Sequence, residues 1–194
     1  MTRPLELPDG SGDGTVGADD RAIIEAIRSG QPEAAARFVL AHQASVYRLC
    51  WRMMRHQQDA EDVVQDTFVR ALGAIGGFDL ERPVPPWLLG IAANRCRTAL
   101  AQRARRPALV DQVVEAPDPR PGLADADDLN AEIDRAMGKL RPEYRLVFSL
   151  YHESGLLYDE IAEAIDRPVG TVKTWLRRAR TQLATDLARR GICC

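Results

Sequence analysis

A proline-rich stretch, PALVDQVVEAPDPRPG at residues 107–122, divides the chain into two parts. It contains four prolines and has no sustained hydrophobic period. Because proline lacks the amide donor that a helix interior needs, no regular helix is expected to run through it. On both sides, apolar residues recur at the three- and four-residue spacing of helices, without the alternation of strands. The sequence therefore predicts an all-α fold of two small helical domains joined by a flexible linker.

The predicted boundaries follow from these changes in composition. The N-terminal stretch is rich in Gly, Asp and Pro, which favours a disordered tail. We expect a disordered tail at residues 1–18, a first helical domain at 19–106, a flexible linker at 107–125, a second helical domain at 126–190 and a short tail at 191–194.

The first domain is predicted to contain four helices. Asp19 or Asp20 is the expected N-cap of the first helix and Asp59 that of the third, since short carboxylates accept hydrogen bonds from the free amides of a first turn. The second helix is expected from about residue 33 to 55 and the fourth from 87 to about 105. The segment FDLERPVPP before the fourth helix contains three prolines, so it is predicted to be a short, stiff loop.

The composition limits the possible functions. Hydrophobic residues make up 45% of the sequence and charged residues 28%, with a formal net charge of -2, as in ordinary soluble globular proteins. There is no apolar run long enough to cross a membrane and no secretory signal pattern, so a cytoplasmic location is expected. The four cysteines form no CxxC or Cys/His cluster with zinc spacing. We therefore predict no metal and no cofactor.

Basic residues concentrate in two segments, one in each domain. Residues 95–106 contain five arginines and no acid, and residues 167–190 contain seven basic residues against the single acid Asp186. Each segment alone could be a solvated helix face. The presence of one in each domain suits a polyanion that the chain contacts at two places.

The second basic segment has the pattern of a helix-turn-helix. In LYDEIAEAIDRPVGTVKTWLRRARTQL, two amphipathic halves flank a break at Asp166-Arg167-Pro168. A helical wheel places the polar and basic residues of the second half opposite its apolar stripe, with Trp175 at the edge of that stripe. A plain helical hairpin with a solvated basic face is the alternative. The predicted DNA-binding face consists of Thr171, Lys173, Thr174, Arg177 and Arg178.

These residues resemble a known family. YDEIAEAIDRPVGTVKTWLRRARTQL looks like region 4 of extracytoplasmic-function (ECF) sigma factors, which are small subunits of bacterial RNA polymerase. DAEDVVQDTFVRAL resembles their region 2.2 helix, and the segment from Phe78 through WLLGIAANRCRTAL resembles regions 2.3 and 2.4. The ordered set covers about residues 20–190.

The resemblance implies a role for each motif. Region 4 would bind the minus-thirty-five element as duplex, through the five residues of the predicted DNA-binding face. The positions that match the polymerase-binding helix are Asp59, Glu61, Asp62, Gln65, Asp66 and Phe68. The positions that match the minus-ten element, with Asn94 as the base-contacting residue and Phe78 as a wall for a flipped base, are Phe78, Trp87, Asn94, Arg95, Arg97 and Arg103.

The implied partners are core RNA polymerase, promoter DNA and an anti-sigma factor. Two departures from the family pattern stand out: Asp166 where Gly is common in the turn, and Thr174-Trp175 where Ser-Arg is common. A stand-alone regulator that uses only the helix-turn-helix is the second hypothesis, which the acidic region 2.2 helix disfavours. An enzyme is the third, and the sequence offers no nucleophile–base pair or phosphate loop for it.

Overall fold

The computed structural model describes residues 15–105 and 124–192, and over these ranges the chain is helical without strands. This confirms the predicted all-α fold. The elements in chain order are α1 (Thr15–Arg28), α2 (Ala34–Met54), α3 (Gln57–Ala74), the 3-10 turn η1 (Ile75–Gly77), α4 (Val84–Arg105), α5 (Ala124–Lys139), α6 (Pro142–His152), α7 (Tyr158–Ile165) and α8 (Val169–Arg189).

Helices α1 to α4 form the first unit around a shared apolar core. Phe38, Leu49 and Met53 of α2 are fully buried, as is Leu88 of α4, because the helical period turns them to one side of their helices. Phe38 meets Phe68 of α3 edge-on, with ring centroids 6.4 Å apart. This core fixes α3 and α4 side by side, and these are the two helices of this unit to which function was assigned.

The starts of three helices differ from the sequence prediction. Helix α1 begins at Thr15, and Asp20 is buried, with its Oδ1 3.0 Å from Nε2 of His42, so Asp20 joins two helices instead of capping one. At α3 the N-cap is His56, whose Nδ1 accepts from the Asp59 amide. Helix α4 begins at Val84, inside the predicted loop, because prolines are tolerated in a first turn where amides lack helical partners.

Helices α5 to α8 form the second unit. Asp166 ends α7 with φ 53°, the left-handed conformation expected for this turn residue, and α8 follows at Val169. Val172 and Leu176 pack into the main core, whereas Ala179, Leu183 and Leu187 pack with α5 in a smaller cluster. The predicted linker at 107–125 lies outside the described residues, except that α5 already includes its last two positions.

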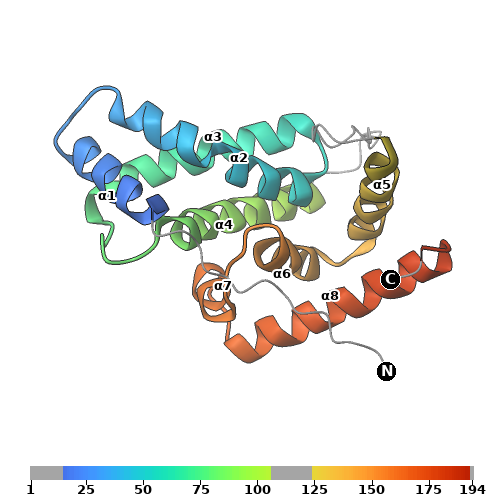
Figure 1. Ribbon diagram of the computed structural model, residues 1–194. Coiled ribbons are helices and arrows are strands. Elements are labelled where there is room, and N and C mark those ends of the chain that lie inside the picture. The colour runs from blue at the N-terminus through green and yellow to red at the C-terminus, as the bar shows by residue number, and fades with distance from the viewer. Residues whose placement is uncertain (1–14, 106–123, 193–194) are drawn as a thin grey trace.

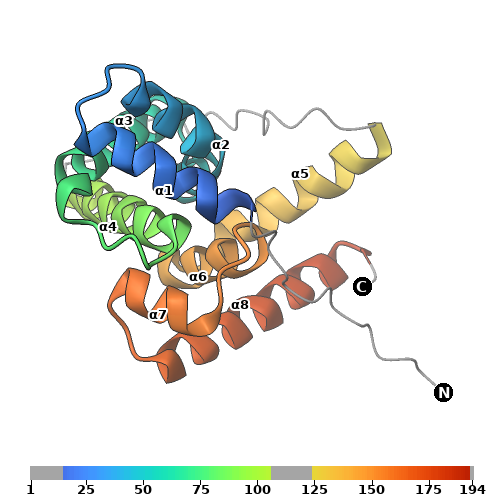
Figure 2. The ribbon, with the colours of Figure 1, turned by 60° about the vertical axis from the view of Figure 1, so that its left-hand side comes forward.

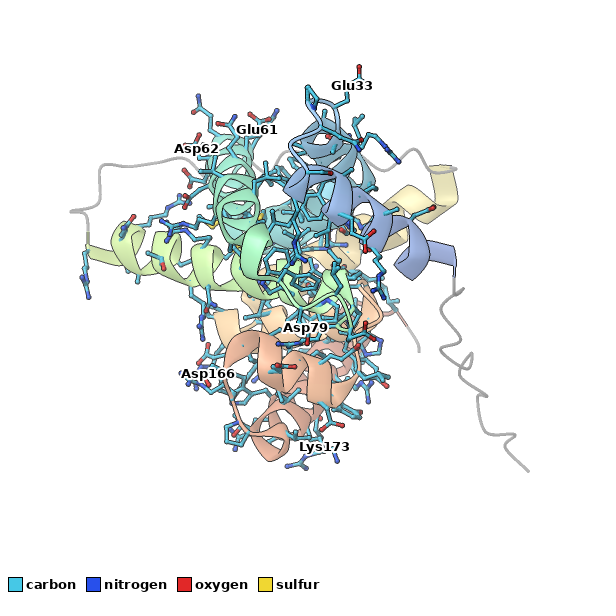
Figure 3. All side chains as sticks on the ribbon, turned by 90° about the vertical axis from the view of Figure 1, so that its left-hand side faces the viewer. Glu33, Glu61, Asp62, Asp79, Asp166 and Lys173 are labelled. Carbon is cyan, nitrogen blue, oxygen red and sulfur yellow. The ribbon has the colours of Figure 1, made fainter. Side chains whose placement is uncertain are left out.

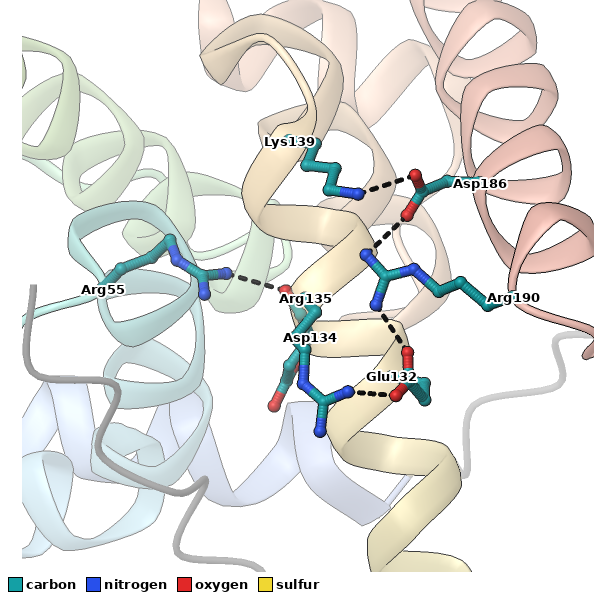
Figure 4. A network of polar contacts seen from close by, with 7 residues as sticks. All are labelled: Arg55, Glu132, Asp134, Arg135, Lys139, Asp186 and Arg190. Atoms are coloured by element: carbon teal, nitrogen blue, oxygen red, sulfur yellow. Dashed lines mark hydrogen bonds and ion pairs between the residues drawn. The ribbon is translucent and has the colours of Figure 1, made fainter.

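Ion pairs add to the contact between α5 and α8. Lys139 donates to Asp186 at 2.8 Å, and Arg190 bridges Asp186 and Glu132 (Figure 4). The hydrogen bond from Arg190 lowers the pKa of Glu132, and the one from Lys139 lowers the pKa of Asp186. Since both acids are paired in the folded state, this contact is electrostatic as well as apolar.

We expect this network to weaken in acid. A carboxyl whose folded pKa is lowered stabilises the fold above its unfolded pKa, about 4 for Asp and Glu, and that contribution is lost as the pH falls through the folded pKa. Glu132→Gln should therefore reduce stability at pH 7 more than at pH 3. Denaturant unfolding at both pH values tests this, with Glu61→Gln on the exposed face of α3 as the control.

The two units pack directly on one another. Helix α4 contacts α7, as Figures 1 and 2 both show, and α2 contacts α6. One continuous apolar cluster contains residues of both units, including Leu88 of α4, Leu150 of α6 and Ile165 of α7. The described part of the chain is therefore a closed arrangement in which the helix-turn-helix rests against the first unit.

Candidate nucleic-acid interface

The outer face of α8 carries the residues predicted to contact duplex DNA. Lys173, Arg177 and Arg178 are exposed, and Thr171 and Thr174 are half-buried on the same helix. Figure 3 shows Lys173 at the end of the molecule that points away from α3. The apolar residues on the opposite side of α8 pack into the core and hold the helix in place. Its first turn can therefore approach a DNA groove with the outer face.

Trp175 and Arg178 are both anchored to the second unit. Trp175 is half-buried and packs against both apolar clusters, as its place at the edge of the stripe predicts. Arg178 donates to the Tyr144 hydroxyl at 3.1 Å, which holds its guanidinium near α6. Of the five predicted DNA contacts, Arg178 is therefore the one that this hydrogen bond ties to α6.

Two tyrosines beside α8 were missed by the sequence analysis. Tyr151 of α6 and Tyr158 of α7 stack with centroids 5.0 Å apart. The Lys173 ammonium lies 5.5 Å from the Tyr158 ring, and the Arg180 guanidinium lies 5.1 Å from the Tyr151 ring. Such contacts orient cations at a modest gain in energy. Tyrosines that alternate with basic residues in the sequence could have indicated these contacts. The rings and cations are brought together, however, only by the turn between α7 and α8.

The outer face of α3 is acidic, and its predicted residues fall into two groups. Glu61, Asp62 and Gln65 are exposed, and we call these three the α3 acidic surface. Figure 3 shows Glu61 and Asp62 at the end of the molecule opposite Lys173. Val69, with 70% of its surface exposed, follows Gln65 by one helical turn and was not predicted. An exposed apolar side chain beside acids suits a protein partner.

The other three predicted α3 residues are committed to the fold. Phe68 is 6% exposed and lies in the core, so the prediction that it contacts polymerase directly is not supported by its position. Asp59 pairs with Arg103 of α4 at 3.1 Å, and Asp66 pairs with Arg95 of α4. These pairs join α3 to α4, so the acids are partly neutralised.

The residues predicted to contact the minus-ten element lie on two different faces of α4, as their ion pairs and hydrogen bonds show. Arg95 and Arg103 lie on the α3 side of α4, through their bonds to Asp66 and Asp59. Asn94 and Arg97 lie on another face, where Arg97 donates to the Asn94 side-chain oxygen. The structure thus brings Asn94 and Arg97 together and separates them from the other two arginines.

Phe78 and Trp87 lie together at the N-terminal end of α4. Their ring centroids are 4.6 Å apart, Phe78 is 8% exposed and Trp87 is half-buried. Arg28 of α1 donates to the carbonyl oxygens of Ile75 and Phe78, which fixes the start of the loop. Phe78 therefore packs on the buried side of the loop, whereas Trp87 remains partly exposed to solvent.

Other kinds of site find little support in the described residues. These residues hold no group of three or more His, Cys, Asp or Glu side chains that could bind a metal ion. Cys50 and Cys96 are free and buried, with sulfurs 3.9 Å apart, and the hydrogen bond between them and their burial raise the pKa of Cys50. No helix in these ranges is long and apolar enough to cross a membrane. Over the described ranges, the geometry defines a helical protein with a helix-turn-helix and a second basic helix, α4.

Comparison with known proteins identifies the class more closely. Residues 38–106 match the family model for Sigma-70 region 2, and residues 130–183 match that for Sigma-70 region 4. The RNA polymerase sigma-H factor of Pseudomonas aeruginosa is 30% identical over 173 residues, covering 83% of this chain and 90% of that protein. The ECF RNA polymerase sigma factor SigW of Bacillus subtilis is 30% identical over 183 residues, covering 84% and 94%.

Solved structures agree with these matches. CnrH in complex with the cytosolic domain of CnrY is similar with a TM-score of 0.66 and 28% identity, over 88% of this chain and 97% of that one. The sigma factor RpoE of Bartonella quintana, solved with the anti-sigma factor NepR, has the same fold, with a TM-score of 0.69 and 22% identity over 80% and 98%. The chain belongs to the ECF family of RNA polymerase sigma factors.

Proposed function

We propose that this sigma factor recognises its promoter with two surfaces and binds core RNA polymerase with a third. Helix α8 contacts the minus-thirty-five duplex, Asn94 and Arg97 of α4 contact the melted minus-ten strand, and the α3 acidic surface binds polymerase. The observation that carries this assignment is the separation of charge: Glu61 and Asp62 lie at the opposite end of the molecule from Lys173. A cationic end suits DNA, and an acidic end repels it.

The contacts at α8 favour groove recognition. Its exposed cations lie in the first turns of a helix that begins at Val169 and is held by buried Val172 and Leu176. Arginine and lysine side chains contact both phosphates and guanine edges. Within α4, Asn94 offers an amide that can bond to a base edge, and Arg97 offers a cation for a neighbouring phosphate.

We infer that the protein is a non-catalytic subunit that acts in the cytoplasm, where RNA polymerase works. We also infer that a protein inhibitor controls it. The support is the relative CnrH, whose structure was determined in complex with the cytosolic domain of CnrY. Co-purification from the native host should recover core polymerase and this inhibitor, and recovery of neither would contradict both assignments.

Reversing two charges on the α3 acidic surface tests the polymerase assignment. Glu61→Lys combined with Asp62→Lys should slow association with core polymerase roughly tenfold at low salt, because complementary charges steer encounter. The control is Glu33→Lys, which changes an exposed acid at the start of α2. Association rates from surface-immobilised core polymerase give the comparison. Equal rates for the variants would place the polymerase contact elsewhere.

A further inference from the structure

Helix α1 precedes the part of the chain that matches Sigma-70 region 2, which begins at residue 38. It nevertheless belongs to the core of the first unit, because Ile23 and Ile24 are buried in the main apolar cluster. The buried Asp20 carboxylate lies 3.0 Å from Nε2 of His42 on α2. An apolar contact and a buried polar pair thus hold α1 against α2, so its other side chains act from a fixed position.

The last residue of α1, Arg28, contacts the segment that leads into α4. Its Nε and Nη2 donate to the carbonyl oxygen of Ile75 at 3.2 and 3.1 Å, and Nη2 also donates to the carbonyl oxygen of Phe78. The first carbonyl lies at the start of η1 and the second directly after its end. A guanidinium holds its donors in one plane, and its charge strengthens the bonds that it donates. Arg28 therefore fixes the point where the chain leaves η1 and enters the loop of residues 78–83.

Further contacts order the rest of this loop. Arg21, seven residues before Arg28 on α1, donates to Glu81 at 3.2 Å, although both side chains are exposed and such a pair adds little by itself. Inside the loop, Asp79 Oδ1 accepts from the Glu81 amide at 3.0 Å, and the Asp79 carbonyl oxygen accepts from the Arg82 amide at 3.1 Å. Because these turns connect the loop residues to one another, fixing the first residue also restrains those that follow.

The first residue of the loop in turn contacts Trp87. The rings of Phe78 and Trp87 lie with centroids 4.6 Å apart, and Trp87 is only half-buried. Trp87 precedes Asn94 by seven residues, which places both on one side of α4. An accessible aromatic ring can stack on an unpaired base. This side of α4 therefore offers an amide and an aromatic surface to the same strand.

We propose that α1 positions the minus-ten site, with Arg28 as the positioning residue. Through the backbone of Phe78, Arg28 fixes the Phe78–Trp87 ring pair, against which an unstacked base of the melted strand rests. This inference rests on the minus-ten role proposed above for α4. Unstacking a base costs free energy, and a surface that is already ordered recovers more of it than one that must be ordered on binding.

A pre-melted promoter with abasic positions tests the role of Arg28. The full chain and core polymerase are combined with a promoter that they select together, held open over the minus-ten element by mismatches, and single bases of the non-template strand are removed in turn. In the wild type, removing the captured base should weaken binding roughly fivefold or more, as expected for the loss of one stacking contact. Arg28→Ala should weaken binding of the intact strand by a similar factor, and removing the same base should then have little further effect.

Two variants control for charge and for the bonds themselves. Arg28→Lys keeps a cationic donor within reach of the same carbonyl oxygens, so it should recover most of the binding. Arg37→Ala removes an exposed arginine near the start of α2 and should leave binding to intact and abasic strands unchanged. Equal losses on both strands in Arg28→Ala would overturn the inference. A matching loss of minus-thirty-five duplex binding through α8 would also overturn it, because Arg28 would then support the fold as a whole.

Asn94→Ala in the same assay separates this inference from the minus-ten assignment. If Asn94→Ala weakens binding of the intact strand and Arg28→Ala does not, α1 does not position the site and the assignment of α4 stands. If neither variant weakens binding and no abasic position affects the wild type, the inference and the minus-ten assignment both fail.

Discussion

Leu176→Ala is expected to destabilise the protein by about 2–5 kcal/mol, which is the usual cost of emptying a filled core position. Leu176 of α8 is 1% exposed and packs in the cluster that contains residues of both units. Removing this side chain therefore weakens both the packing that holds α8 in place and the contact between the two units. Denaturant unfolding of the full chain measures the change in the free energy of unfolding.

The neighbouring residue provides the control for that experiment. Arg177 is exposed, so Arg177→Ala should change stability by less than about 0.5 kcal/mol. It should instead weaken binding to minus-thirty-five duplex by about 1–3 kcal/mol. Similar losses of stability in the two variants would show that α8 is not packed as described. Unchanged duplex binding in Arg177→Ala would remove Arg177 from the DNA-binding face.

Asn94→Ala should impair formation of the open promoter complex far more than binding to duplex DNA. A direct side-chain contact to a base edge contributes about 1–3 kcal/mol, so the open complex should be reduced roughly 5- to 150-fold. Duplex binding through α8 should be nearly unchanged, because Asn94 lies on a different helix. Permanganate footprinting of melted thymines measures the first quantity, and fluorescence anisotropy with duplex measures the second.

A second amide on α4 controls for effects on the helix itself. Gln102 is exposed on the same helix, two turns further on, and Gln102→Ala should leave both measurements unchanged. Equal losses of open complex and duplex binding in Asn94→Ala would count against the minus-ten assignment. A loss for Gln102→Ala as large as that for Asn94→Ala would assign the effect to the basic helix as a whole.

Local features of the fold were predictable because their causes are local. The helical periods, the break at Asp166 and the outward face of α8 all follow from the spacing of apolar residues and from turn chemistry, and Trp175 lies at the edge of its stripe as the wheel indicated. The start of α4 was misjudged because prolines were counted as breakers, although in a first helical turn they remove no hydrogen bond.

Features that depend on tertiary packing could not be predicted in the same way. The pairing of Arg95 with Asp66 and of Arg103 with Asp59 requires α3 and α4 to lie side by side. Phe68 lies on the apolar side of the acidic helix with Val63 and Leu72, but its contact with Phe38 depends on how α3 packs against α2. A Cβ atom at Gly90 would lie 2.9 Å from the carbonyl oxygen of Ala164, which is 74 residues away in the chain, so no local pattern reveals why glycine stands there.

Initiation by a reconstituted polymerase tests the central claim most directly. Purified full-length protein would be combined with core RNA polymerase and a library of genomic fragments, and the transcript starts would be sequenced. The account predicts that the protein co-purifies with core polymerase and that transcripts start from a defined subset of promoters with shared minus-thirty-five and minus-ten elements. Failure to bind core polymerase, or starts no different from those of core polymerase alone, would contradict it.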